Sequence, residues 1–198
     1  MTIIIFASVV GGILFGYTLL PPEMLSMMDQ ISTLLLGLLI FSVGIDIGGN
    51  KGALKNIKQK SKMLGGLTTA VIAGSAVGGL LTGWIFNLPA NTSLAISAGY
   101  GWYSLSGIIL KNLASAEIGA IAFMSNVFRE MMAFVLIPIL AIKVNHLTSL
   151  APPGATSMDT TLPIISRATT PDISMVAFLN GLILSTLVPI LVPFFYSL

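Results

Sequence analysis

Two adjacent charged residues, Arg129 and Glu130, stand near the middle of an apolar stretch that runs from about 115 to 142. A charge near the centre of a bilayer costs a few kcal/mol, so it usually faces a partner or a polar cavity. Neighbouring residues lie about 100° apart around a helix, and these two therefore do not face each other. Asn126 can approach both, because it precedes them by three and four residues. We expect these three residues to bind a charged ligand; the alternative is a structural charge pair that bridges to other helices.

A second carboxylate, Asp159, lies in a stretch rich in hydroxyl, proline and glycine residues, 151–163. A carboxylate with hydroxyls beside it offers acceptors for a cation or an ammonium group. We expect Asp159, with Thr156 and Ser157, to bind such a group, and Na⁺ is one candidate. The alternative is an Asp that caps a half-helix by accepting backbone N–H bonds. A third carboxylate, Asp46, ends an apolar segment, where a binding role and a solvated interfacial position are both open.

The stretch 99–107 (GYGWYSLSG) combines glycines with aromatic and hydroxyl residues inside an apolar segment. In lipid an unpaired backbone amide costs several kcal/mol, so loosened backbone survives only inside protein or beside a water-filled cavity. Aromatic faces attract ammonium groups, although packing against lipid or another helix is the alternative for these rings. The glycines expected to permit broken helices are Gly99, Gly101, Gly107 and Gly154. The other residues expected to line the site are Trp102, Tyr103, Ser104 and Ser106.

The whole chain has the composition of a membrane protein. Of its 198 residues 55% are apolar and 8% charged, and the mean hydropathy is +0.98. Ordinary globular chains carry about 25% charged residues. We therefore predict an all-α polytopic protein in which residues 1–198 form a single transmembrane domain. The net charge of +2 gives no case for nucleic-acid binding, and without cysteine there is no thiolate metal site.

About seven hydrophobic segments are expected, since a spanning helix needs about 20 apolar residues. They run from about 2–20, 31–47, 63–86, 92–110, 115–142, 151–167 and 173–195. The fourth and sixth, at about 92–111 and 151–167, are expected to be broken or re-entrant. Within the third, small residues recur every four positions and predict close packing against another helix. These are Gly66, Ala70, Gly74 and Gly78.

The lysine-rich loop at about 49–62 is expected to be cytoplasmic under the positive-inside rule. The N-terminus is then cytoplasmic too. The C-terminus lies outside whether the two irregular segments cross or re-enter. Lys111 and Arg167 are expected to fall inside, and only Lys143 outside.

Two irregular polar segments among spanning helices are typical of secondary transporters, whose broken helices meet near the midplane of the membrane. The chain contains no nucleotide-binding loop, zinc-protease motif or nucleophile elbow. We therefore expect a secondary transporter, with no enzymatic activity and no cofactor.

These polar stretches resemble the signatures of the bacterial lysine exporter (LysO) family. The resemblance rests on 99–107, 154–159, Arg129–Glu130, 181–185 and Val188–Pro189. It covers most of the chain and matches the larger, C-terminal part of the family's full-length members. It implies a fold of the cation/proton antiporter and bile-acid symporter superfamily. Ser125-Asn126 stands where members often carry an Asn-Asp type pair, which leaves the cation stoichiometry open.

The resemblance also implies a function: export of L-lysine and close analogues across a bacterial or archaeal cell membrane by alternating access, coupled to H⁺ or Na⁺. Glu130 would take the cationic side chain or a coupling proton, Asp159 the second cationic group, and Arg129 or a half-helix N-terminus the carboxylate. A separately encoded small membrane protein or self-association would complete the transporter. The alternatives are a sodium/proton antiporter or organic-anion transporter of the same architecture, or a membrane subunit that needs a partner.

Overall fold

The computed structural model of the chain describes residues 57–198 continuously, and before them the positions 11, 14–16, 18, 21, 27, 31, 34 and 45. The first two expected segments, Asp46 and most of the basic loop at about 49–62 therefore lie outside the described residues. Contacts divide the chain into two compact units, residues 1–46 and 47–198. The second unit carries the candidate site. The prediction of one transmembrane domain stays a prediction.

Three long helices form the frame of this unit: α4 (Ile57–Phe86), α7 (Ala116–Lys143) and α9 (Pro171–Tyr196). Each is long and apolar enough to cross a membrane, as expected for segments three, five and seven. The Ser115 side chain starts α7 by accepting a hydrogen bond from the Ile118 N–H at 3.2 Å. Proline stands at the first position of α9, where its missing N–H costs nothing.

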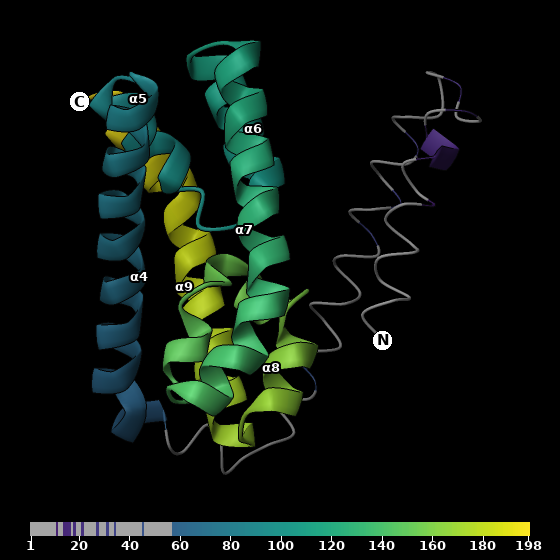
Figure 1. Cartoon of the computed structure of the whole chain (residues 1–198), viewed down its shortest axis with the longest axis vertical. Helices are drawn as coiled ribbons and strands as arrows, with labels where there is room; N and C mark the ends of the chain where they lie inside the picture. Colours follow the sequence, from purple (N-terminus) through teal and green to yellow (C-terminus); the bar gives the residue numbers. More distant parts are fainter. Residues whose placement is uncertain are drawn as a thin grey trace. The chain divides into compact units, whose positions relative to one another are not determined.

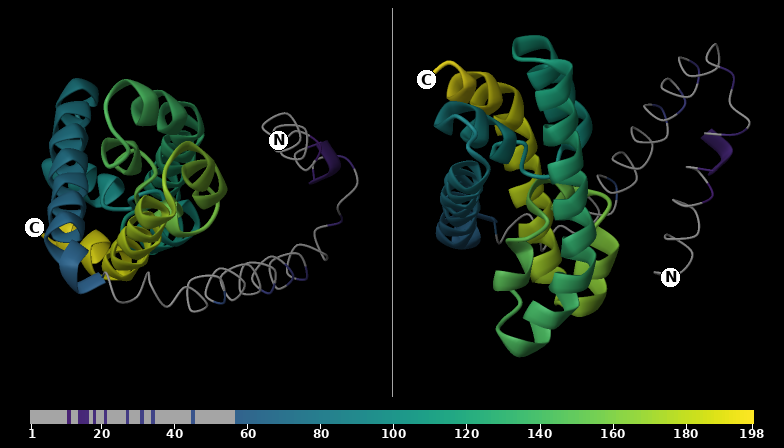
Figure 2. Two further views of the ribbon diagram at one scale, coloured as in Figure 1. Left: turned by 90° about the horizontal axis from the view of Figure 1, so that it is seen from below. Right: turned by 45° about the horizontal axis from the view of Figure 1, so that its top comes forward.

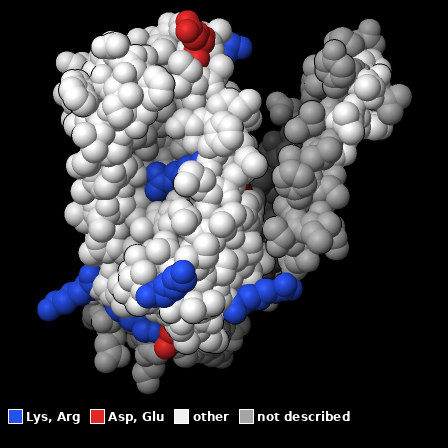
Figure 3. Space-filling view, viewed as in Figure 1, with Lys and Arg blue, Asp and Glu red and all other residues white. Residues whose placement is uncertain are grey.

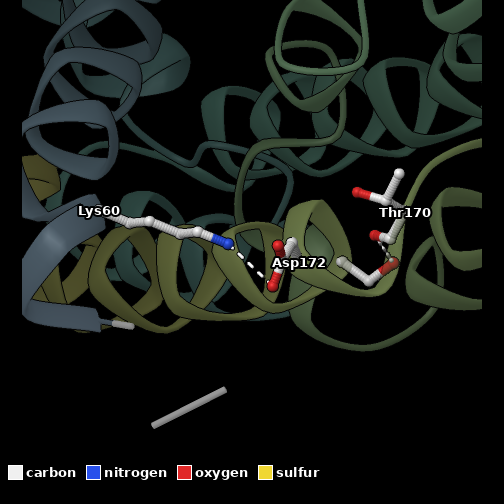
Figure 4. A network of polar contacts seen from close by, with 4 residues as sticks. Lys60, Thr170 and Asp172 are labelled. Atoms are coloured by element: carbon white, nitrogen blue, oxygen red, sulfur yellow. Dashed lines mark hydrogen bonds and ion pairs between the residues drawn. The ribbon is translucent and has the colours of Figure 1, made fainter. Parts of the chain in front are cut away.

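Contacts between side chains fix the direction of these helices. Near the start of α4 and α9, Lys60 Nζ lies 2.9 Å from Asp172 Oδ1 (Figure 4). Two turns further along both helices, the Thr68 hydroxyl donates to Asn180 Oδ1 at 2.8 Å. The two helices therefore run parallel. We call the end where they begin the Lys60 end, and the end where α4 stops the Phe86 end.

The fourth expected segment does not cross the unit. It forms α5 (Ala90–Ser97) and α6 (Tyr103–Leu113), joined by five non-helical residues (Figure 1). Helix α5 runs antiparallel to α4, because Gly83 and Gly79 contact Ser93 and Ser97 respectively.

Helix α6 runs back toward the Phe86 end. It packs antiparallel to α7, with Gly107 against Phe123 and Lys111 against Gly119. We call 90–113 the first hairpin; it enters and leaves at the Phe86 end. There, Asn91 Nδ2 donates to the Tyr196 carbonyl at 3.1 Å, so that α5 lies beside the last turns of α9 (Figure 2).

The sixth expected segment also re-enters, from the opposite end. It consists of two 3₁₀ turns, Thr148–Leu150 and Gly154–Met158, followed by the short helix α8 (Leu162–Ala168). It begins after the end of α7 and finishes before the start of α9, both at the Lys60 end. Its middle reaches the centre of α9, where the Ser157 hydroxyl donates to the Ala177 carbonyl at 2.7 Å. We call 147–168 the second hairpin.

Re-entry corrects the expected positions of two lysines. Lys111 lies at the Phe86 end, away from Lys60, because α6 turns back instead of crossing. Lys143, at the end of α7, lies at the Lys60 end. Lys60, Lys62, Lys143 and Arg167 therefore share one end of the unit, where Figure 3 shows basic side chains gathered. The asymmetry is as large as the one expected from the sequence, because one lysine still lies at the opposite end, now Lys111 in place of Lys143.

Among the described residues, the small-residue stripe of α4 has no packing partner, and its predicted close packing stays a prediction. Gly66, Gly74 and Gly78 have no atom of the described residues within 4 Å of the position of an added Cβ. The close approach is made one position further along, by Gly79 and Gly83. Those two glycines match Ser97 and Ser93 on the antiparallel α5, which have the same spacing of four residues. The partner helix therefore decides which of two small-residue rows is buried.

Candidate functional site

The tips of the two hairpins meet backbone to backbone. The Ala155 N–H donates to the Tyr100 carbonyl at 2.7 Å. A Cβ at Gly101 would lie 3.0 Å from the Pro153 carbonyl oxygen, and one at Gly154 would overlap the Tyr100 carbonyl. The φ angles of Tyr100, Gly101 and Gly154 are 46°, 98° and 61°, in the left-handed region that favours glycine. Glycine is therefore needed here both for conformation and for space.

Asn126, on α7, holds the tip of the first hairpin. Its Oδ1 accepts a hydrogen bond from the Gly101 N–H at 2.7 Å. Its Nδ2 donates to the carbonyls of Ala122 at 2.9 Å and Ile96 at 3.3 Å, and to the Ser106 hydroxyl at 3.4 Å. The side-chain amide of Asn126, which is 3% exposed, therefore forms hydrogen bonds with backbone groups that the break between α5 and α6 leaves unpaired. In this structure Asn126 holds the backbone in place.

Arg129, one turn along α7, holds the second hairpin. Its Nε donates to the Pro152 carbonyl at 2.9 Å and its Nη2 to the Ala151 carbonyl at 3.3 Å. Its Nη1 donates to the Ser75 hydroxyl on α4 at 2.8 Å. The guanidinium therefore joins three elements. Among residues 57–198 it forms no ion pair with a carboxylate.

Glu130 and Asp159 meet on another side of α7, and Thr160 lies between them. The Thr160 hydroxyl hydrogen-bonds to Glu130 Oε1 and lies 3.3 Å from Asp159 Oδ1. It has one proton and can donate to one carboxylate at a time. Tyr103, the first residue of α6, is close enough to interact electrostatically with both carboxylates. We call Glu130, Asp159, Thr160 and Tyr103 the acidic cluster.

The acidic cluster is partly exposed. Glu130 is 8% exposed, Asp159 is half-buried and Thr160 is exposed. Within the part of the chain that the structure describes, neither carboxylate of the cluster pairs with Lys, Arg or His. That part also brings together no group of three or more His, Cys, Asp or Glu side chains. Two carboxylates and a hydroxyl suit an ammonium group or a monovalent cation.

The other residues expected at the site lie at the hairpin tips or beside them. The Thr156 hydroxyl donates to the Pro153 carbonyl at 3.0 Å, and the Ser157 hydroxyl to the Gly154 carbonyl at 2.7 Å. The Ser106 hydroxyl donates to the Trp102 carbonyl at 2.9 Å. These hydroxyls therefore form hydrogen bonds with carbonyl groups in the irregular parts of the two hairpins. Trp102 is half-buried before α6, and Ser104 is exposed on that helix.

Sequence reasoning missed two residues of this arrangement. Thr160 links the two carboxylates, and its position next to Asp159 in a hydroxyl-rich stretch was a usable signal. Ser75 binds the guanidinium of Arg129 from α4. A single serine on an apolar helix carries no pattern that would have identified it.

Comparison with known proteins decides the family. The family model described as "Lysine exporter LysO" matches residues 6–196. The chain belongs to the lysine exporter LysO family. The resemblance inferred from the polar motifs is thereby confirmed, and with three apolar helices of spanning length the chain is a multi-pass membrane protein of a transporter family.

Two relatives of this family differ in length. "Lysine exporter LysO" of Escherichia coli (strain K12) is 44% identical over 160 residues, which cover 80% of this chain and 52% of that protein. The chain thus spans about half the length of this relative. "Putative lysine exporter" of Haemophilus influenzae is 32% identical over 195 residues, which cover 98% of this chain and 97% of that protein. No solved structure matches the chain.

Proposed function

We propose that this chain exports L-lysine and close analogues from the cytoplasm as a secondary transporter. The observation that carries the proposal is the acidic cluster: two carboxylates, without a cationic partner among the described residues, beside the meeting point of two re-entrant hairpins. The names of the two relatives support lysine as the substrate.

The charges of the cluster suit the substrate. Lysine carries two ammonium groups, and the cluster offers two carboxylates, Glu130 and Asp159. Carboxylates withdrawn from water without a cation are costly, so the cluster favours a bound cationic group. Glu130 takes one ammonium group or a coupling proton, and Asp159 takes the second group or a coupling Na⁺.

The two hairpins suggest how the site is exposed in turn to each side. They enter from opposite ends and meet at their tips, the arrangement that secondary transporters use to place a site between two half-pathways. A membrane potential that is negative inside opposes the exit of a cation by about 2.3 kcal/mol per charge per 100 mV. Coupling to inward H⁺ or Na⁺ supplies the driving force. The same carboxylates carry the coupling ion on the return step.

The orientation follows the basic residues. The Lys60 end faces the cytoplasm of a bacterial or archaeal cell, the N-terminus lies inside and the C-terminus outside. A small membrane protein or a second copy of the chain is proposed as the partner that completes the transporter. The broader likeness to cation/proton antiporters and bile-acid symporters is part of this proposal.

Counterflow in proteoliposomes tests the function. Purified chain is reconstituted with unlabelled lysine inside, and uptake of labelled lysine is followed with and without imposed H⁺ or Na⁺ gradients. We expect lysine exchange, and net export that one of the gradients accelerates. Sodium exchange without lysine exchange would instead identify a sodium/proton antiporter. Transport that needs an added membrane protein would identify a subunit.

A further inference from the structure

A cavity of about 230 Å³ lies between α4, α5 and α7, on a different side of α7 from Glu130. Hydroxyl groups of all three helices line it, among them Ser75, Ser97 and Ser125. Arg129 also lines it, and among the described residues no carboxylate does. We call this cavity the hydroxyl cleft. Figure 3 shows a basic side chain set into the face of the molecule at mid-height, apart from those at the lower end.

Arg129 has donors to spare at this cleft. A guanidinium carries five N–H groups in a planar fork. Three of them bind the carbonyls of Ala151 and Pro152 and the hydroxyl of Ser75. Two remain without a partner among residues 57–198, and so does the positive charge. A cation withdrawn from water in a membrane helix calls for a counter-charge.

The chemistry of the cleft selects a carboxylate as that counter-charge. Carboxylate oxygens match the guanidinium fork, and charge-assisted hydrogen bonds of this kind are among the strongest in proteins. The remaining oxygen lone pairs can accept from the hydroxyls of Ser75 and Ser125, whereas the Ser97 hydroxyl already donates to the Leu94 carbonyl at 2.9 Å. The acidic cluster has the opposite character, because it offers only acceptors beside the hydroxyl of Thr160. Arg129 and Glu130 are consecutive, so the two sites are neighbours about 100° apart around α7.

We infer that the hydroxyl cleft is a subsite for the α-carboxylate of the transported amino acid, distinct from the acidic cluster that binds ammonium groups. This inference rests on the proposed function. The cleft is then the feature by which the protein distinguishes an amino acid from a diamine. A diamine satisfies the acidic cluster but leaves the guanidinium without a partner.

Two glycines of α4 provide a matched test. Gly78 lines the cleft, and a Cβ there would meet no described atom within 4 Å. Gly74, one turn earlier, is equally open but does not line the cleft. Gly78→Leu fills the cleft without striking backbone, and Gly74→Leu places the same side chain outside it. At both positions Arg129 lies beyond 4 Å from the added Cβ, and we expect its hydrogen bonds to the second hairpin to stay intact.

Equilibrium binding to the purified full chain in detergent gives the readout, with labelled lysine and with cadaverine, which is lysine without its carboxylate. The wild type should bind lysine at least about tenfold more tightly than cadaverine, the effect of one charge-assisted hydrogen-bond pair. Gly78→Leu should lower lysine affinity about tenfold and leave cadaverine affinity unchanged. Gly74→Leu should behave as the wild type.

Each of the other outcomes overturns either the carboxylate subsite alone or the subsite together with lysine export. Equal affinity for lysine and cadaverine in the wild type, or equal behaviour of the two leucine variants, overturns the carboxylate subsite and leaves lysine export standing. No binding of either compound overturns both. If Gly78→Leu fails to fold, Ser125→Leu fills the cleft from α7 and must show the same selective loss.

Discussion

Each of the two re-entrant hairpins enters and leaves the unit at one end, but they differ in the polar groups at their tips. The first has two α-helices, and its break is satisfied by Asn126 and by its own serine hydroxyls. The second has 3₁₀ turns and a seven-residue helix, and it presents Asp159 and Thr160 to Glu130. The first hairpin is regular and electrically neutral at its tip, whereas the second is irregular and charged.

This difference suggests a division of labour. Regular helices packed on α7 through Gly107 and Gly119 hold the first tip in a fixed position. The second tip has fewer helical hydrogen bonds of its own and depends on Arg129 for two of its carbonyls. Its groups can therefore respond to a ligand more readily than those of the first. Substitutions at the two tips should therefore separate structural support from ligand binding.

The largest effect is expected where the tips touch. Gly154→Ala forces an L residue to a φ of 61° and pushes its Cβ into the Tyr100 carbonyl. The combined strain and overlap should cost about 3 kcal/mol or more of unfolding free energy. Gly101→Ala should cost less, because its Cβ meets the Pro153 oxygen only at 3.0 Å. Thermal and SDS-induced unfolding in detergent micelles measures both.

The open glycine of α4 is the control for these two substitutions. Gly74→Ala should be neutral or stabilise the chain by up to about 1 kcal/mol, since alanine favours helix over glycine. Equal stability of all three variants would show that the tips do not meet as described.

The second effect concerns ligand binding at the charged hairpin. Glu130→Gln removes one of the two charges that face the ammonium groups and keeps the shape of the side chain. A hydrogen bond to a charged group contributes about 1.5–3 kcal/mol, so lysine affinity should fall about 10- to 150-fold. Lysine counterflow in proteoliposomes should fall with it. The free energy of unfolding should stay the same or increase, because the substitution removes a buried charge that has no cationic partner among the described residues.

Another carboxylate of the same helix serves as the control. Glu117 is exposed in the first turn of α7, and Glu117→Gln should leave lysine binding unchanged. If both variants transport lysine like the wild type, the acidic cluster is not the binding site.

The third effect concerns the neutral hairpin. Asn126→Leu leaves the Gly101 N–H without an acceptor and removes three further hydrogen bonds. A buried donor without a partner costs about 1–3 kcal/mol, so the unfolding free energy should fall by about 2 kcal/mol. Because Asn126 also lines the hydroxyl cleft, lysine affinity should fall as well, whereas the cadaverine affinity of the folded fraction should change less than about threefold, unlike the pattern at Glu130. Ser104→Ala, on the exposed side of α6, should change none of these quantities.

The sequence predicts the charged residues of this site better than their geometry. Arg129, Glu130 and Asp159 stand out because charges are rare in apolar segments. Their partners do not, since Ser75 is a lone serine, and the tie between Asn126 and the first break depends on tertiary contacts. The prediction of three spanning helices and two irregular segments follows from hydropathy and glycine placement.

Hydropathy could not decide whether those irregular segments cross. A half-segment such as 103–113 has the same composition whether it continues to the far side or turns back. Its direction is set by the packing of Gly107 and Lys111 on α6 against Phe123 and Gly119 on α7, which no local pattern encodes. The placement of Lys111 and Lys143 was wrong for that reason. The buried row of α4 was missed similarly, because two small-residue rows lie side by side and only α5 distinguishes them.

The smallest effect is expected at the Lys60 end, where the second hairpin enters. Lys60 and Asp172 join the first turns of α4 and α9 (Figure 4), but the Asp172 side chain is 61% exposed. Exposed ion pairs contribute about 0–1 kcal/mol and are screened by salt. A double-mutant cycle with Lys60→Met and Asp172→Asn should therefore give a coupling energy of about 0.5 kcal/mol that disappears at 1 M salt. A coupling well above 1 kcal/mol, with faster lysine efflux in the single variants, would show that the pair closes the entrance of the second hairpin. The contrast between the hairpins would then extend from their tips to the ends at which they enter.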